Sequence, residues 1–148
     1  MESHLYHVNL NWEKERIGNI YSPELNDKIA VATPPEFPKG VEGIWSPEHL
    51  FTAAVNSCFM TTFLAIAENS KLEFTSFSCA SSGKLEQVEG KFLMTEIILN
   101  PELVITNSID AEKAEKILQK AEKACLISNS IKSTIVLQTN VKVLETQV

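Results

Sequence analysis

The stretch that decides the fold is Ser46-Pro47-Glu48-His49-Leu50-Phe51-Thr52-Ala53-Ala54-Val55-Asn56-Ser57-Cys58-Phe59. It begins with three signals of a helix start. Ser46 can cap the first turn, Pro47 suits the first helical position, and Glu48 complements the helix dipole. The apolar residues that follow predict one helix to about Asn69, roughly 35 Å long. They cover more than one face of the helix, which is typical of a helix buried in a core.

The residues before this helix predict short strands and a loop. Alternating polar and apolar residues and turn-forming dipeptides are the signals. Strands are predicted at Leu5–Trp12, near Ile20-Tyr21 and at Lys28–Ala32, with turns at Gly18-Asn19 and Asn26-Asp27. The proline-rich stretch Thr33–Gly40 predicts a loop that leads to the helix.

The residues after the helix predict a hairpin, a second helix and a last strand. The hairpin joins Phe74–Leu85 to Lys91–Val104 through Val88-Glu89-Gly90. The second helix runs from an N-cap at Asp110 to about Ala124, and Thr134–Leu144 alternates like a closing strand. The residues of the second helix expected to face the core recur at helical spacing: Ala114, Ile117, Leu118, Ala121 and Cys125. This order predicts one α+β domain over residues 1–148, with a helix wrapped by sheet.

Composition excludes several classes of protein. The chain has 148 residues, 44% hydrophobic and 22% charged, which fits one soluble globular domain. The net charge of −6 and the lack of a basic cluster argue against a nucleic-acid partner. The sequence contains no uninterrupted apolar run of about 18 residues, so no membrane span is predicted. Met1–His4 lacks the pattern of a signal peptide, and we therefore expect a cytoplasmic protein.

The three cysteines are the candidate reactive residues. An odd number (Cys58, Cys79 and Cys125) in a reducing compartment is a poor disulfide framework, and scattered histidines without a CxxC pair argue against a metal site. Cys58 has two interpretations, a small buried hydrophobe or a peroxide-reducing nucleophile. The second requires a cation or hydrogen-bond donors, and the mid-helix dipole helps little, so we expect a cation from elsewhere in the protein. Cys79 is interpreted as a strand filler.

Two motifs resemble the OsmC/Ohr family (osmotically inducible protein C / organic hydroperoxide resistance protein). The stretch Ser46–Phe59 is similar to that family's nucleophile helix, and Ala32-Thr33-Pro34 to a strand end before its variable loop. Ala124–Ser130 resembles its second cysteine motif, Cys-Pro-x-Ser, with Leu126 in place of proline. The order of elements agrees along nearly the whole chain. The resemblance implies central buried helices wrapped by antiparallel sheets, in an intertwined homodimer.

The resemblance also implies a reaction. An organic hydroperoxide would oxidise Cys58 to a sulfenic acid, and Cys125 would close a disulfide with it. A dithiol reductant, either a dihydrolipoyl group or a small thiol, would then reduce the disulfide by exchange. No cofactor or metal is needed for this cycle.

By position, Arg16 and Glu48 match the family's arginine and glutamate. The resemblance implies that Arg16 stabilises the Cys58 thiolate and binds the peroxide oxygens, while Glu48 holds Arg16 in place. Without the family resemblance, Arg16 would be interpreted as a solvated turn residue and Glu48 as a charged residue in the first turn of the helix. Glu48 and Cys58 lie ten residues apart, about 15 Å along one helix, so they cannot share a site directly within it. Either Arg16 bridges part of the gap, or Glu48 comes from a second subunit.

A preference for organic peroxides requires an apolar site. The residues available to line it are Phe51, Phe59, Phe63, Ile44 and Trp45. Two other functions stay open. One is a non-catalytic OsmC-like protein that binds a small ligand or senses oxidation, with a Cys58 pKa near or above about 8.5. The other is a structural domain whose cysteines belong to the core.

Overall fold

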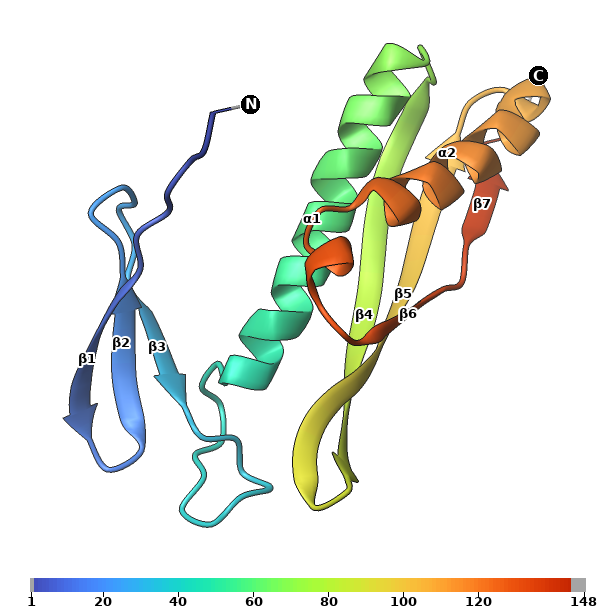
Figure 1. The fold of residues 1–148 in the computed structure, drawn as a ribbon. Helices are drawn as coiled ribbons and strands as arrows, with labels where there is room; N and C mark the ends of the chain where they lie inside the picture. The colour runs from blue at the N-terminus through green and yellow to red at the C-terminus, as the bar shows by residue number, and fades with distance from the viewer. Residues whose placement is uncertain (1, 145–148) are drawn as a thin grey trace. The chain divides into compact units, whose positions relative to one another are not determined.

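The structure is a computed structural model that describes residues 2–144. It divides into two compact units, with the boundary between Leu50 and Phe51 (Figure 1). The first unit holds a small sheet and the start of the long helix. The second holds the rest of that helix, a larger sheet and the second helix.

The N-terminal unit is built on a three-stranded antiparallel sheet in the order β1-β2-β3. Its strands are β1 (Asn9–Lys14), β2 (Ile17–Tyr21) and β3 (Ile29–Ala32). The first strand therefore begins later than the predicted Leu5. The turn predicted at Gly18-Asn19 is wrong, because both residues pair within β2 and the chain turns at Glu15, where φ is +50°.

Gly18 serves close packing instead of a turn. A Cβ atom at this position would lie 2.9 Å from the carbonyl oxygen of Asn11 on the neighbouring strand. The loop predicted at Thr33–Gly40 is confirmed. The chain then returns to the sheet, because the Ala32 N–H donates to the Trp45 carbonyl oxygen at 2.8 Å. This places Trp45 directly before the long helix.

Helix α1 (Pro47–Asn69) starts as predicted. The Ser46 side-chain oxygen accepts a hydrogen bond from the His49 N–H at 3.1 Å, which is N-cap geometry. Four residues at four-residue spacing form its buried stripe: Val55, Phe59, Phe63 and Ala67. Met60 and Leu64 are each 40% exposed, so within this chain the helix is buried along one stripe and not all round.

Among residues 2–144, α1 is the one helix whose length and apolar content would suffice for a membrane span. Core helices of soluble proteins share this property. In α1, Phe59 and Phe63 pack on Phe77 of the C-terminal unit, while 22% of the apolar window is buried within this chain.

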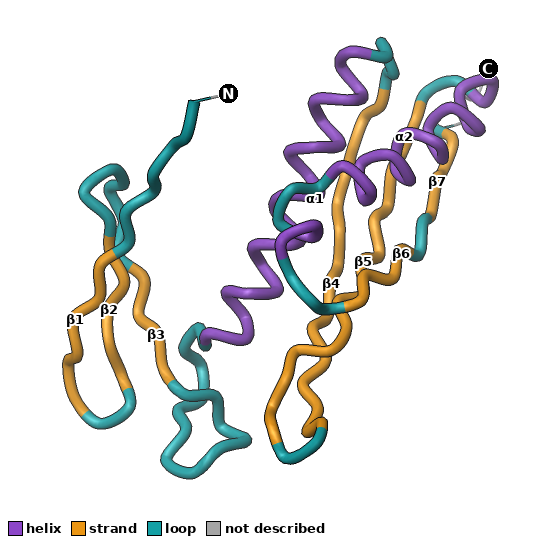
Figure 2. Tube along the Cα trace, viewed as in Figure 1, coloured by secondary structure: helices purple, strands orange, loops and turns teal. Residues whose placement is uncertain are grey.

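The sheet of the C-terminal unit is mixed. Strands β4 (Phe74–Val88) and β5 (Lys91–Ile105) form the predicted antiparallel hairpin, with its turn at Glu89 (φ +50°) and Gly90 (φ +81°). The tail forms two strands, β6 (Thr134–Leu137) and β7 (Asn140–Val143), where we expected one. Both run parallel to β5, so the antiparallel arrangement applies to the N-terminal sheet and the hairpin. Figure 2 shows the loop that separates them.

Helix α2 (Ala111–Ala124) crosses the strands of this sheet (Figure 1). A short 3₁₀ turn, η1 (Ser108–Asp110), precedes it. Asp110 occupies the predicted N-cap position but makes no capping hydrogen bond, whereas the Asn107 side chain accepts from the Ile109 N–H at 3.1 Å. The inward positions predicted from helical spacing are all buried: Ala114, Ile117, Leu118, Ala121 and Cys125.

The core of the C-terminal unit lies between β5 and the helices. Alternate residues of β5 are fully buried: Ile97, Leu99, Leu103 and Ile105. The Phe63 ring stacks on Phe77 of β4, with ring centroids 4.6 Å apart. This packing fixes α1 on the sheet, and the expected α+β class is confirmed. The single domain over 1–148 and the intertwined homodimer stay predictions.

Candidate active site

Cys58 lies in the middle of α1, half-buried, directly before the buried Phe59. Its sulfur lies 3.9 Å from the hydroxyl oxygen of Thr62, one helical turn further on. Cys58 is therefore at the edge of the buried stripe, where its sulfur can reach both the core and the surface.

Cys125 ends α2 and is fully buried. Its backbone leaves the helical region at φ −63° and ψ 114°. The chain then makes a turn, residues 125–130, in which the Asn129 N–H donates to the Cys125 carbonyl oxygen at 3.1 Å. The Ser130 hydroxyl also donates to the Leu126 carbonyl oxygen at 2.8 Å. This turn includes the short 3₁₀ segment η2 (Ser128–Ser130).

The two sulfurs interact directly, and the contact favours ionisation of Cys58. Burial raises the pKa of Cys58. Hydrogen bonds from the Cys125 thiol, the Ile127 N–H, the Thr62 hydroxyl and the Leu126 N–H outweigh that effect, so the pKa of Cys58 is lowered overall. The N–H groups of Ile127 and Leu126, in the turn after α2, thus contribute to the lowered pKa of Cys58, because hydrogen-bond donors stabilise a thiolate.

Cys125 is shifted in the opposite direction. Burial raises the pKa of the Cys125 thiol, and the contact with Cys58 raises it further, while the Ser128 hydroxyl and N–H partly oppose the rise. The Ser128 hydroxyl oxygen is buried and makes no hydrogen bond of normal geometry, although it lies near enough to Cys125 to lower the pKa of that thiol. The pKa values of the two thiols are therefore shifted in opposite directions, down for Cys58 and up for Cys125.

Cys79 ionises less readily than a free cysteine. It lies in β4 opposite Pro101, where burial raises the pKa of its thiol to about 11. Its carbonyl oxygen accepts a hydrogen bond from the Asn56 side chain at 2.9 Å, which ties β4 to α1. This position agrees with the interpretation of Cys79 as a strand filler.

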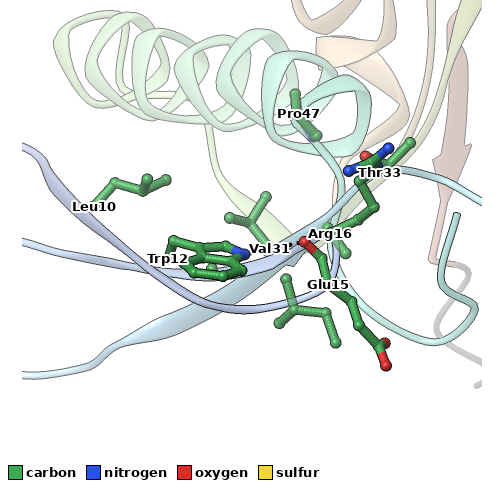
Figure 3. A pocket seen from close by; sticks show the side chains of 10 residues that line it. Leu10, Trp12, Glu15, Arg16, Val31, Thr33 and Pro47 are labelled. Carbon is green, nitrogen blue, oxygen red and sulfur yellow. Dashed lines mark hydrogen bonds between the residues drawn. The ribbon is translucent and has the colours of Figure 1, made fainter. Parts of the chain in front are cut away.

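Arg16 lies in the turn between β1 and β2 and is exposed. It lines an open pocket of about 330 Å³ in the N-terminal unit, together with Trp12, Glu15, Thr33 and Pro47. Figure 3 shows the apolar side chains Leu10, Trp12 and Val31 of this pocket, with Arg16 beyond them. Glu48 directly follows Pro47 and is half-buried. Arg16 and Glu48 thus belong to the same unit of the chain.

A cation was expected beside Cys58, with Arg16 as the candidate. Arg16 and Cys58 lie in different compact units, and their contact stays a prediction. The groups that lower the pKa of Cys58 are neutral donors from α1 and from the turn after α2, all within the C-terminal unit.

The five aromatic and aliphatic residues expected at a substrate site lie in different environments. Phe59 and Phe63 are fully buried and pack against Phe77, so core contacts already occupy their rings. Phe51 is half-buried against the same core, and Ile44 is half-buried in the N-terminal unit. Trp45 is 52% exposed and meets the His49 ring edge-on, with centroids 6.2 Å apart.

No role was predicted from the sequence for Thr62 or for the N–H groups of Leu126 and Ile127. Ser128 was noted only as part of the second cysteine motif. Thr62 was detectable in principle, because it stands four residues after Cys58, the spacing at which helical side chains meet. The backbone donors had no signal in the sequence, because any residue except proline carries an N–H. Among residues 2–144, no group of three or more His, Cys, Asp or Glu side chains could hold a metal ion.

Comparison with known proteins gives a consistent result. A model of the family described as OsmC-like protein matches residues 40–140. The uncharacterized protein YmaD of Bacillus subtilis is 30% identical over 97% of both chains. Peroxiredoxin OsmC of Escherichia coli is 30% identical over 66% of this chain and 67% of its own. The structure of an organic hydroperoxide resistance protein OsmC from Legionella pneumophila matches with a TM-score of 0.74 and 25% identity, covering 95% of this chain and 99% of the other.

Proposed function

This chain belongs to the OsmC-like protein family, and on that premise we propose that it is a thiol-dependent peroxidase that reduces organic hydroperoxides. One observation carries the proposal. The thiol of Cys125 hydrogen-bonds to the sulfur of Cys58, and the two pKa values are shifted in opposite directions. Such a pair has a nucleophile ready to attack and a thiol ready to resolve the product.

The first step is attack of the Cys58 thiolate on the terminal oxygen of the hydroperoxide. The S–O bond forms as the O–O bond breaks, and the electron pair leaves with the alkoxide, which takes up a proton to become an alcohol. Cys58 is oxidised to the sulfenic acid and the peroxide is reduced. The donors around Cys58 favour the thiolate form that this step consumes.

The second step forms a disulfide. The Cys125 sulfur attacks the Cys58 sulfenic sulfur, the S–O bond breaks, and hydroxide leaves with the Cys125 proton as water. The Ser128 hydroxyl and N–H favour negative charge on Cys125, which assists the attack. A dithiol of the dihydrolipoyl type or a small thiol then restores both cysteines by thiol–disulfide exchange.

We assign Arg16 and Glu48 the roles that the family resemblance implies. Arg16 binds the peroxide oxygens and adds positive charge near the thiolate, and Glu48 orients Arg16. The exposure of Arg16 beside an open pocket with an apolar lining supports a role in substrate binding. The apolar part of the substrate would meet Trp45, Ile44 and Phe51, since Phe59 and Phe63 serve the core.

The proposal includes a cytoplasmic homodimer of single-domain subunits. Apolar side chains on and before β1 are largely exposed in the isolated chain: Leu5, Tyr6, Val8, Leu10 and Trp12. A second subunit that covers them would remove apolar surface from water. Light scattering at micromolar concentration should therefore give twice the mass of one chain.

The competing function, a non-catalytic ligand-binding or redox-sensing protein, requires an ordinary Cys58 thiol. The lowered pKa of Cys58 favours the peroxidase instead. The direct test is consumption of cumene hydroperoxide by purified protein in the presence of a dithiol. Cys58→Ser should abolish turnover while Cys79→Ser should retain it, and normal turnover in Cys58→Ser would refute the proposal.

A further inference from the structure

One side of helix α2 carries a row of lysines. Lys113, Lys116, Lys120 and Lys123 follow one another at spacings of three and four residues, which places them on the same side of an α-helix. All four residues are exposed. The net charge of the chain is −6, so this lysine row is a local concentration of positive charge on an acidic protein.

Part of the row lines an open pocket of about 430 Å³ at the start of α2. Ser70, which follows α1, borders the pocket, and Ile109 and Ile117 give it an apolar part. The lining also includes Glu112, whose carboxylate pairs with Lys116 at 3.5 Å. The positive charge of the lining exceeds its negative charge, because it contains three lysines of the row: Lys113, Lys116 and Lys120.

Glu115, a further acidic residue of α2, is engaged within the fold. Its carboxylate accepts hydrogen bonds from the Gln119 side chain at 3.0 Å and from the Thr139 hydroxyl at 2.6 Å. Neighbouring residues of a helix point to different sides, so Glu115 does not share the side of Lys116. The lysine row therefore presents its positive charge to solvent.

Exposed apolar side chains stand at both ends of the row. Ile109, before α2, is 84% exposed, and Leu126, after it, is 66% exposed. A partner that covered them would remove apolar surface from water. Leu126 directly follows Cys125, so a partner that covers the row from end to end reaches the place where the proposed disulfide forms.

The reducing step of the proposed cycle needs a thiol that reaches this disulfide, although Cys125 is fully buried. A reductant held on α2 would act at a raised effective concentration, and a row of lysines is complementary to carboxylates. We propose that the lysine row of α2 is the docking surface of the reductant, an acidic protein segment that carries a dithiol. The inference names the reducing partner and rests on the proposed function.

The docked dithiol would reduce the protein by two exchanges. The carrier thiolate attacks the Cys58 sulfur, the S–S bond to Cys125 breaks, and Cys125 leaves and takes up a proton. The second thiolate of the carrier then attacks the carrier sulfur of the mixed disulfide. Cys58 is released as a thiolate, and the carrier is oxidised to a disulfide.

The test measures reduction of the peroxide-oxidised protein by a synthetic peptide in which glutamates flank a dihydrolipoyl-lysine. A second peptide, with glutamines in place of the glutamates, is the uncharged control. The docking variant reverses three charges of the row: Lys113→Glu, Lys116→Glu and Lys120→Glu. The control variant makes the same change in net charge at exposed lysines outside α2: Lys28→Glu, Lys39→Glu and Lys91→Glu.

Each rate is divided by the rate of the same protein with free dihydrolipoamide. The relative rate with the glutamate peptide should fall roughly tenfold in the docking variant, because each reversed charge turns an attraction into a repulsion. It should change little in the control variant. Equal falls in both variants, or equal rates with the two peptides, would overturn the inference.

Binding separates this inference from the proposed function. The glutamate peptide, in its oxidised lipoyl form, is titrated against Cys58→Ser protein with and without the docking substitutions, and fluorescence anisotropy follows a dye on the peptide. Binding that the docking substitutions abolish, in a protein that reduces no peroxide, supports the docking surface and refutes the proposed function. Peroxide turnover with free dihydrolipoamide, together with peptide binding that the substitutions leave unchanged, refutes the inference alone. Tighter binding of an oligothymidylate than of the peptide would also overturn the inference.

Discussion

The thiol of Cys125, at the end of α2, donates a hydrogen bond to the sulfur of Cys58 in the middle of α1. Among residues 2–144 there are three free cysteines, and the third, Cys79, lies in β4. The contact between Cys58 and Cys125 therefore involves the two cysteines carried by α1 and by the end of α2. The bond lowers the pKa of one thiol and raises that of the other. The order of events in the proposed cycle follows from that asymmetry.

The first prediction is the pH dependence of Cys58 oxidation. The thiolate is the reacting form, so the rate with cumene hydroperoxide should rise with pH and level off once Cys58 is ionised. Because the pKa of Cys58 is lowered, the midpoint of this rise should lie at lower pH than the midpoint for a free cysteine. Stopped-flow measurement from pH 5 to pH 10, with N-acetylcysteine as the reference thiol, tests this, and a midpoint at or above that of the reference would be inconsistent with it.

The second prediction concerns Thr62. Thr62→Val removes the hydroxyl that lies 3.9 Å from the Cys58 sulfur while nearly preserving the shape of the side chain. The thiolate fraction at pH 7 should fall about two- to fivefold, the effect of one lost hydrogen bond. Thr62→Ser keeps the hydroxyl and is the matched control. Identical labelling of both variants by iodoacetamide would assign no role to this hydroxyl.

The third prediction separates the two chemical steps. Ser128→Ala removes the hydroxyl that favours negative charge on Cys125, so disulfide closure should slow while the first oxidation stays unchanged. The Cys58 sulfenic acid should then persist longer and be trapped in greater yield by dimedone. Ser128→Thr retains a hydroxyl and should resemble the parent. A slower first step in Ser128→Ala would place the hydroxyl at Cys58 instead.

The fourth prediction distinguishes core from substrate contacts. Phe59→Ala should lower the free energy of unfolding by about 3–5 kcal/mol, because Phe59 is fully buried. Trp45→Ala removes a side chain that is 52% exposed and should cost about 1 kcal/mol or less. Trp45→Ala should instead raise KM for cumene hydroperoxide more than for hydrogen peroxide. Urea unfolding and steady-state kinetics measure both effects, and an unchanged KM ratio would remove Trp45 from the site.

Local signals in the sequence predicted the elements that depend on local interactions. The start of α1 follows from a cap and a proline that act within one turn, and Ser46 caps it as expected. The turn at Glu89-Gly90 has the positive φ angles that glycine favours. The turn predicted at Gly18-Asn19 was wrong because Gly18 serves the close approach of β2 to Asn11 of β1. That approach depends on strand pairing, which no local sequence signal shows.

The site was predictable in part for the same reason. The motifs around Cys58 and Cys125 identified both cysteines, since their residue types carry the chemistry. Two of the four donors that lower the pKa of Cys58 are backbone N–H groups of the turn after α2, and their position depends on the tertiary fold. The residues Thr134–Leu144 show one alternating pattern of polar and apolar side chains although they form two strands. Both strands, β6 and β7, pair with β5, so the pattern continues from one to the other.

The most direct test of the account is the identity of the bond formed by one equivalent of cumene hydroperoxide. Peptide mass spectrometry of the treated protein, without reductant, should find Cys58 linked to Cys125, with the loss of two hydrogens and with Cys79 unmodified. The account is contradicted if Cys58 instead stays a thiol, or if it is overoxidised while Cys125 remains free.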